Sequence, residues 1–238
     1  MHPVLPNRHD LPSPMKLLAS LLFAAVLAVP GVTTFAQEAK PVATSAEAKV
    51  PAAPAPAVAK PDLAKGEASF NAVCAACHGA EGNSTIPVNP KLAQQHPDYL
   101  VKQLTEFKSG KRASPVMSGM AALLSEADAK NIAYWVGSKT SKPGFAKDRE
   151  LVMLGERIFR GGVADRQIPA CAGCHSPNGA GIPAQYPRLS GQHADYAVAQ
   201  LIAFRSGARK NSPQMTQVAA KLNDAEIKAV ADYVAGLR

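Results

Sequence analysis

Apolar residues recur every three or four positions over most of the chain, and this spacing predicts amphipathic helices. A first helix is predicted to begin at Asp62 and to continue through Phe70, and a second follows Pro97. Ser125 and Asp128 form a capping-box signal at the start of a third helix. Its predicted buried stripe consists of Ala129, Ile132, Ala133 and Val136. Because no stretch reads convincingly as a strand, the predicted fold class is all-α.

The same pattern returns about 97 residues later, which indicates an internal duplication. His96-Pro97-Asp98-Tyr99 matches His193-Ala194-Asp195-Tyr196. Beyond Lys210, which adds one residue, Ser114-Pro115-Val116-Met117 matches Ser212-Pro213-Gln214-Met215. A second capping box, Asn223 to Glu226, begins the repeated third helix, whose stripe is Ile227, Val230, Ala231 and Val234. We therefore expect two domains, at residues 62–140 and 141–238.

The N-terminal part of the chain reads as an export signal. Met15-Lys16 precedes an apolar run of 13 residues, Leu17 to Val29, and small residues follow up to Ala36. This layout predicts a cleavable signal peptide in residues 1–36, and we hypothesise that translation begins at Met15. A bilayer-spanning helix needs about 20 residues, so a retained anchor is the less favoured alternative.

Residues 37–61 are rich in alanine and proline and predict an extended, mobile spacer. The whole chain carries a net charge of +8. This charge is uneven, because residues 62–140 hold eight basic and seven acidic groups and residues 141–238 hold thirteen and eight. The excess could orient the molecule on a partner or an anionic lipid surface, or serve solubility alone. Export argues against a nucleic acid partner.

Residues 74–78 read CAACH and residues 171–175 read CAGCH, and these two motifs contain all four cysteines of the chain. Cysteines at this spacing followed by histidine are typical of covalent c-type haem attachment, in which both thiols form thioethers and the imidazole binds iron. A zinc site, a redox dithiol and disulfides are the alternatives, but none needs a histidine after each pair. The sequence thus predicts two covalently bound haem c groups. The attachment residues are Cys74, Cys77, Cys171 and Cys174, and the proximal iron ligands are His78 and His175.

Methionine is the predicted second axial ligand. Among the methionines beyond the signal, only Met117 and Met215 occupy matching positions, each in a predicted loop after Ser-Pro-x. Val218 replaces Met120 in the second copy, and Met153 stands in a helical apolar run. His96 and His193 also recur. They could compete as ligands, although a contact at the start of the second helix or a bond to a haem propionate is favoured.

A histidine and a methionine on each iron would close both sites. Such sites pass electrons, but they do not bind oxygen or peroxide. We expect His78 and His175 to donate their other ring N–H to backbone carbonyls, with the loops Ile86-Pro87 and Ile182-Pro183 as suppliers. Aromatic residues form only 5% of the chain, so haem-free domains should fold poorly.

The CAACH and CAGCH motifs, the segment IPAQYPRLSGQHADY and the paired Ser-Pro-x-Met segments resemble the di-haem cytochrome c4 family over residues 62–238. The resemblance implies two tandem class I cytochrome c domains, related by a pseudo-twofold axis, with neighbouring haem edges. It also implies a periplasmic electron carrier, soluble or loosely membrane-associated, that relays electrons from a quinol-oxidising complex towards a terminal oxidase. The long spacer leaves room for a tethered version.

Two other functions stay open. The same domains could form the electron-transfer subunit of a dehydrogenase or oxidase complex. A di-haem peroxidase would need one iron with an available sixth position, and the symmetric Met117 and Met215 argue against it. The prediction is therefore an electron-transfer protein and not an enzyme.

Overall fold

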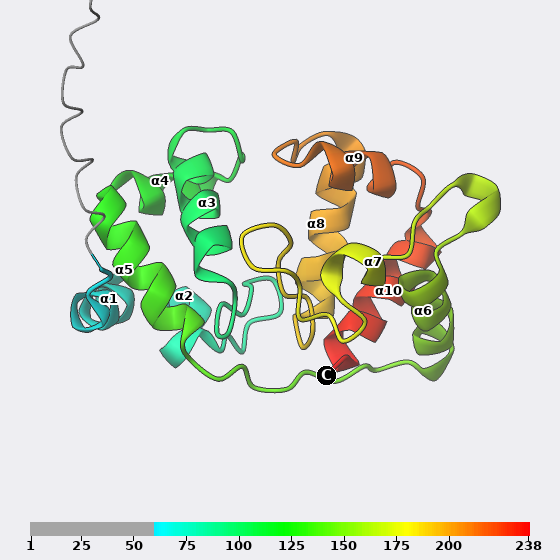
Figure 1. The fold of residues 1–238 in the computed structure, drawn as a ribbon, viewed down its shortest axis with the longest axis horizontal. Coiled ribbons are helices and arrows are strands. Elements are labelled where there is room, and N and C mark those ends of the chain that lie inside the picture. The colour runs from blue at the N-terminus through cyan, green and yellow to red at the C-terminus, as the bar shows by residue number, and fades with distance from the viewer. Residues whose placement is uncertain (1–59) are drawn as a thin grey trace, which may run out of the picture. The chain divides into compact units, whose positions relative to one another are not determined.

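The computed structural model describes residues 60–238. The predicted signal peptide and all but the last residues of the predicted spacer lie outside this range. The described residues fold into helices joined by loops, and the all-α prediction is confirmed. Figure 1 shows the helices in two sets, α1 to α5 and α6 to α10, joined by a segment without helix.

The α-helices of the two sets follow the same order along the chain, whereas the 3-10 turn follows the motif helix in the first set and precedes it in the second. The first set comprises α1 (Leu63–Ser69), a π-helical turn η1 (Phe70–Cys74), α2 (Ala75–His78), a 3-10 turn η2 (Ala80–Gly82), α3 (Pro97–Lys108), α4 (Pro115–Ala122) and α5 (Glu126–Gly137). The second set comprises α6 (Arg149–Gly161), a 3-10 turn η3 (Ala164–Arg166), α7 (Ala172–His175), α8 (Ala194–Ser206), α9 (Pro213–Ala219) and α10 (Asp224–Gly236).

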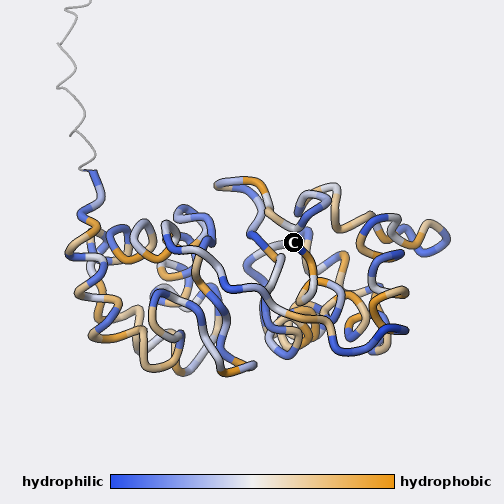
Figure 2. The backbone as a smooth tube through the Cα atoms, turned by 90° about the horizontal axis from the view of Figure 1, so that it is seen from below, coloured by the Kyte–Doolittle hydropathy of each residue, from blue (hydrophilic) through white to orange (hydrophobic). Residues whose placement is uncertain are grey.

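The predicted helix starts are confirmed. The side chain of Asp62 accepts a hydrogen bond from the backbone N–H of Lys65 and caps α1. Complete capping boxes stand at Ser125 before α5 and at Asn223 before α10. The predicted stripes of α5 and α10 are buried throughout. Figure 2 shows how apolar and polar positions interleave along the helices of both sets.

The first helix of each set crosses the last one at very short range. A Cβ atom added to Gly66 of α1 would lie 2.2 Å from the carbonyl oxygen of Asn131 in α5. A Cβ atom on Gly155 of α6 would lie 2.1 Å from the carbonyl oxygen of Ala229 in α10. Glycine is therefore required at both crossings, because any side chain would separate the helices.

An aromatic pair lies beside each crossing. The ring centroids of Phe70 and Trp135 are 5.1 Å apart, and those of Phe159 and Tyr233 are 5.4 Å apart. Phe70 and Phe159 are fully buried. These pairs anchor the two separate hydrophobic cores, one in each set of helices.

In residues 60–238 the only β-type pairing is at isolated β-bridges, so no strand forms. One β-bridge joins Val163 to Ile168, in the segment between α6 and the second CxxCH motif. Another joins Arg112 to Arg209, which are equivalent positions of the two copies. Over the same range, no helix is both long enough and apolar enough to cross a bilayer.

Arg112 and Arg209 are buried where α3 and α8 approach each other. The Arg112 guanidinium donates to Gln103 of its own copy and to Tyr196 and Gln200 of the other. Arg209 donates in turn to Gln200, Gln103 and Tyr99. The two copies thus contact each other through reciprocal hydrogen bonds, as expected for halves related by a twofold axis.

Candidate haem sites

The four cysteines lie in the short helical segments that carry the motifs. Cys74 and Cys171 are half-buried, Cys77 and Cys174 are exposed, and none is in a disulfide. Burial raises the pKa of Cys74 and of Cys171 to about 11 each. A redox dithiol is activated by a lowered thiol pKa, so the raised pKa of these two thiols argues against the dithiol hypothesis.

The zinc alternative also lacks support. In the part of the chain that the structure describes, no three side chains of the metal-binding types His, Cys, Asp or Glu gather as a metal site would require. Each cysteine pair stands with its own histidine, in its own set of helices. This separation suits two independent attachment sites.

His78 and His175 are both buried, with exposed fractions of 8% and 6%. The Nδ1 atom of His78 lies 2.9 Å from the carbonyl oxygen of Pro90, and that of His175 lies 3.0 Å from the carbonyl oxygen of Pro187. Because a carbonyl only accepts, Nδ1 carries the proton in each ring, and Nε2 is left with its lone pair. This is the tautomer that an iron ligand needs.

Burial also keeps these imidazoles neutral. It lowers the pKa of His78 and of His175 below the ordinary value, and the hydrogen bond to proline offsets only part of that effect. The neutral ring is the form that binds metal ions.

The carbonyl groups that accept these two hydrogen bonds differ from the predicted ones. We expected the loops Ile86-Pro87 and Ile182-Pro183 to supply the acceptors, but Pro90 and Pro187 do so. The Ile86 carbonyl instead accepts from the Ser84 hydroxyl, and the Ile182 carbonyl is used in a turn with Tyr186. The sequence held a usable signal, because Pro90-Lys91-Leu92 recurs as Pro187-Arg188-Leu189.

Met117 and Met215 occupy equivalent positions in the first turns of α4 and α9. The sequence predicted a loop here, and this was wrong. Ser114 and Ser212 each accept from the methionine N–H, at 3.3 and 3.4 Å, while proline begins each helix. Both methionines are half-buried, whereas Met120 and Met153 are 40% and 53% exposed.

His96 and His193 stand directly before α3 and α8, but their side chains cap neither helix. The Nε2 atom of His96 lies 2.9 Å from the carbonyl oxygen of Ala180, and that of His193 lies 2.9 Å from the carbonyl oxygen of Ser84. Each ring therefore contacts the segment that follows the other copy's CxxCH motif. These contacts disfavour both histidines as axial ligands.

The surroundings of the motifs fit a flat apolar group. The half-buried apolar side chains that pack against the first core include two motif residues, Cys74 and Ala75, together with Leu92, Val101 and Leu124. The second core has a similar set, which includes Cys171, Ala172, Leu189, Val198, Leu201 and Val218. Thiols, a neutral imidazole and a thioether form the donor set of a covalently bound haem with two axial ligands.

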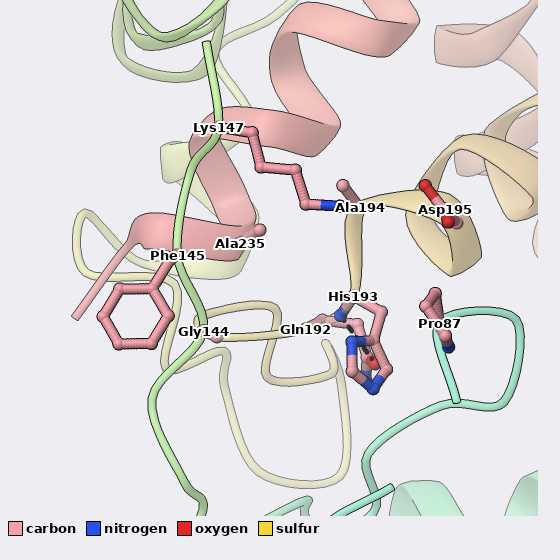
Figure 3. Close-up of a pocket in the computed structure, with 10 residues that line it drawn as sticks. Pro87, Gly144, Phe145, Lys147, Gln192, His193, Ala194, Asp195 and Ala235 are labelled. Atoms are coloured by element: carbon pink, nitrogen blue, oxygen red, sulfur yellow. Dashed lines mark hydrogen bonds between the residues drawn. The ribbon is translucent and has the colours of Figure 1, made fainter. Parts of the chain in front are cut away.

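The structure also contains a pocket that the motif residues and the candidate methionines do not line. Figure 3 shows it beside the start of α8, where the Lys147 side chain of the connecting segment extends towards Ala194; Phe145, His193 and Asp195 also line it. No motif cysteine, proximal histidine or candidate methionine lines it.

Comparison with known proteins places the chain. A family model described as cytochrome c matches residues 63–140 and again residues 152–238. The cytochrome c4 of Thiocapsa roseopersicina is 47% identical over 189 residues, which cover 78% of this chain and 96% of that protein. This chain belongs to the cytochrome c4 family. The cytochrome c4 of Pseudomonas aeruginosa is also 47% identical, over 74% of this chain and 89% of that protein.

A solved structure agrees with the cytochrome c4 assignment. The crystal structure of reduced recombinant cytochrome c4 from Pseudomonas stutzeri matches with a TM-score of 0.72 and 42% identity, over 75% of this chain and all of that one. As a member of this family, the chain carries two covalently bound haem c groups. It transfers electrons and is not an enzyme, as the sequence predicted.

Proposed function

We propose that this cytochrome c4 is a periplasmic carrier that takes electrons from a quinol-oxidising complex and passes them to a terminal oxidase. Cys74 and Cys77 hold the first haem, and Cys171 and Cys174 hold the second. His78 with Met117, and His175 with Met215, are the proposed axial ligand pairs. The observation that carries the proposal is the equivalent placement of both pairs on matching helices.

This ligand set suits relay of electrons at high potential. A thioether is a soft, neutral donor that favours ferrous over ferric iron, and a bound haem c supplies the one-electron couple. The polypeptide fixes the imidazole by its Nδ1 bond to proline and fixes the methionine backbone by the serine cap. Two filled axial positions also exclude small substrates from the iron.

The domain and export predictions belong to the same proposal. We take residues 1–36 as the signal peptide, 37–61 as the spacer, and 62–140 and 141–238 as the two haem domains. Peripheral association with the membrane would follow from the basic excess of residues 141–238 rather than from an inserted helix.

The test uses protein purified from the periplasm of a host that attaches haem c. Intact-mass analysis should give a chain that begins after Ala36 and carries two haem groups. Stopped-flow mixing should show rapid reduction by a quinol-oxidising complex and reoxidation by a terminal oxidase. A protein with one haem, or one that exchanges no electrons with either complex, would overturn the proposal.

Thiosulfate dehydrogenase is the alternative electron donor, and a specific comparison supports it. A protein named thiosulfate dehydrogenase electron acceptor, from Stutzerimonas stutzeri, is 38% identical over 69% of this chain and 78% of that protein. A solved thiosulfate dehydrogenase, TsdBA from Marichromatium purpuratum, also contains a matching region, with a TM-score of 0.68 and 31% identity over 74% of this chain and 40% of that one. Reduction by thiosulfate dehydrogenase at a rate above that by the quinol-oxidising complex would select this alternative.

A further inference from the structure

The peptide group that accepts the hydrogen bond of His78 is itself hydrogen-bonded to the second domain. The carbonyl of Pro90 and the N–H of Lys91 belong to one peptide group, and this N–H donates to Gln192 Oε1 over 2.9 Å. Gln192 Nε2 donates back to the carbonyl oxygen of Lys91, also over 2.9 Å. A side chain from the second domain therefore clamps the backbone that holds the first domain's proximal histidine.

The same arrangement occurs in the opposite direction. His175 donates to the carbonyl of Pro187, and the N–H of the same peptide group, from Arg188, donates to Gln95 Oε1 over 2.8 Å. Gln95 Nε2 donates to the carbonyl oxygen of Arg188 over 3.0 Å. Each domain thus supplies one glutamine to the proximal side of the other domain's haem.

Both glutamines are held firmly in place. Gln95 is 7% exposed, and Gln192 is half-buried. The Oε1 atom of each also accepts from the next backbone N–H, that of His96 or His193, at 3.1 and 3.0 Å. Three hydrogen bonds per side chain fix its rotamer, so the clamp acts as a rigid connection between the domains.

A hydrogen bond at one end of a peptide group strengthens the bond at its other end. Donation by the Lys91 N–H to Gln192 polarises the amide and makes the Pro90 carbonyl a better acceptor. A better acceptor draws the Nδ1 proton of His78 and makes Nε2 a stronger donor to iron. Stronger donation favours ferric iron and lowers the potential of that haem.

We propose that Gln192 and Gln95 are positioning residues that each lower the potential of the haem in the other domain. This inference rests on the axial role proposed for His78 and His175. If the glutamines only held the two domains together, replacing one of them would affect both haems alike. The proposal instead states that each glutamine affects the potential of one haem, the haem of the other domain.

The test replaces each glutamine by leucine in the protein that carries both haems. Gln192→Leu should raise the potential of the first haem, and Gln95→Leu that of the second. At a fixed solution potential, the ferric-to-ferrous ratio of the affected haem should fall about two- to tenfold, because the glutamine acts on the partner of the iron ligand and not on the ligand itself. The other haem should keep its ratio.

The readout is a redox titration followed by NMR, in which haem methyl signals assign each potential to its domain. The hyperfine-shifted ring signals of the proximal histidine should move in the same haem only. Tyr196→Phe is the matched control, because it removes one bond of Arg112 across the same interface without touching either proline peptide. It should leave both potentials unchanged.

Three results would overturn the inference. They are equal shifts of both haems, a shift confined to the mutated domain's own haem, and no shift while both variants keep two haems and native spectra. If one variant fails to fold, the reciprocal variant still decides the matter. Failure of the proposed histidine ligation would instead show in the parent protein, as missing hyperfine-shifted ring signals of His78 or His175.

Discussion

The serine caps of α4 and α9 determine where each methionine side chain starts. Met117 stands three residues after Ser114, and Met215 three residues after Ser212, so both leave the first turn of a short helix. The sequence singled out these two methionines because only they recur. It did not reveal the helix, since Ser-Pro is a signal for turns as well as for helix starts.

Removing one of these side chains should open one iron site. Met117→Ala protein, reduced at neutral pH, should bind about one equivalent of carbon monoxide per chain, because the first haem would lose its proposed sixth ligand. An optical titration measures the stoichiometry. Met120→Leu is the control, since Met120 is exposed and has no counterpart in the second copy, and it should bind none. Equal binding by both variants would contradict the assignment of Met117.

Glu106 is a buried carboxylate of the interface between the copies, and its counterpart is Ala203. Burial alone would raise the pKa of Glu106, but hydrogen bonds from Lys102 and Asn211 outweigh it and hold the pKa below its ordinary value of 4.5. Asn211 comes from the other copy and donates over 2.6 Å. Sequence could not reveal this bond, because it joins residues 105 positions apart in non-equivalent places.

The lowered pKa predicts a pH-dependent contribution to stability. Glu106 is stabilising above pH 4.5, and this contribution is lost as pH falls through the lower pKa of the folded state. Glu106→Gln should lower the free energy of unfolding by about 1–3 kcal/mol at pH 7 and should weaken its loss in acid. Urea unfolding between pH 7 and 3 measures both effects. Glu67→Gln, at an exposed site of α1, is the control and should behave as wild type. If Glu106→Gln lost as much unfolding free energy between pH 7 and 3 as the wild type does, the prediction would be contradicted.

At the scale of elements, the duplicated helices were largely predictable. Capping boxes and apolar stripes are local signals, so α5 and α10 could be placed from sequence with their buried faces. The crossings at Gly66 and Gly155 could not, because a glycine within a helix does not show which backbone it meets. The π-helical turn before Cys74 is likewise invisible in apolar spacing.

A methyl group at one crossing should separate the helices that build the second core. Gly155→Ala places Cβ at 2.1 Å from a backbone oxygen, which cannot rotate away. We expect a loss of about 1–3 kcal/mol or more in the free energy of unfolding, as overpacked cores show. Gly173→Ala is the matched control, because no atom lies within 4 Å and Ala76 already occupies the equivalent position. Chemical denaturation compares them, and equal stability would refute the account of the crossing.

At the scale of the whole molecule, each core is small and depends on the group beside the CxxCH motif. Half-buried apolar residues such as Leu92 and Leu189 pack against each core from the motif side. A protein made without haem attachment, for example with all four cysteines replaced by serine, should lose cooperative thermal unfolding and much of its helical circular dichroism. The haem-bearing protein is the control. A sharp melt of the haem-free chain with full helicity would contradict this prediction.

The contacts between the copies were the least predictable part. Gln95, Gln192, Arg112 and Arg209 recur in the sequence, so their equivalence was readable. Their partners were not, because each lies roughly one repeat away along the chain and the bond forms only after both copies have folded. The recurrence of a polar residue in both copies indicates a shared role, but it does not show which residue is its hydrogen-bond partner.

The reciprocal bonds of Arg112 and Arg209 have a consequence for how such a chain could arise. A face that presents both the donor and the acceptor of every bond is complementary to itself, so a lone ancestral domain would have formed homodimers through it. Joining two such domains in one chain makes the encounter between them intramolecular and independent of concentration. In a covalently joined pair, each half can change its sequence independently of the other. The Glu106–Asn211 bond is an example, because it occurs once and has no counterpart at the equivalent positions.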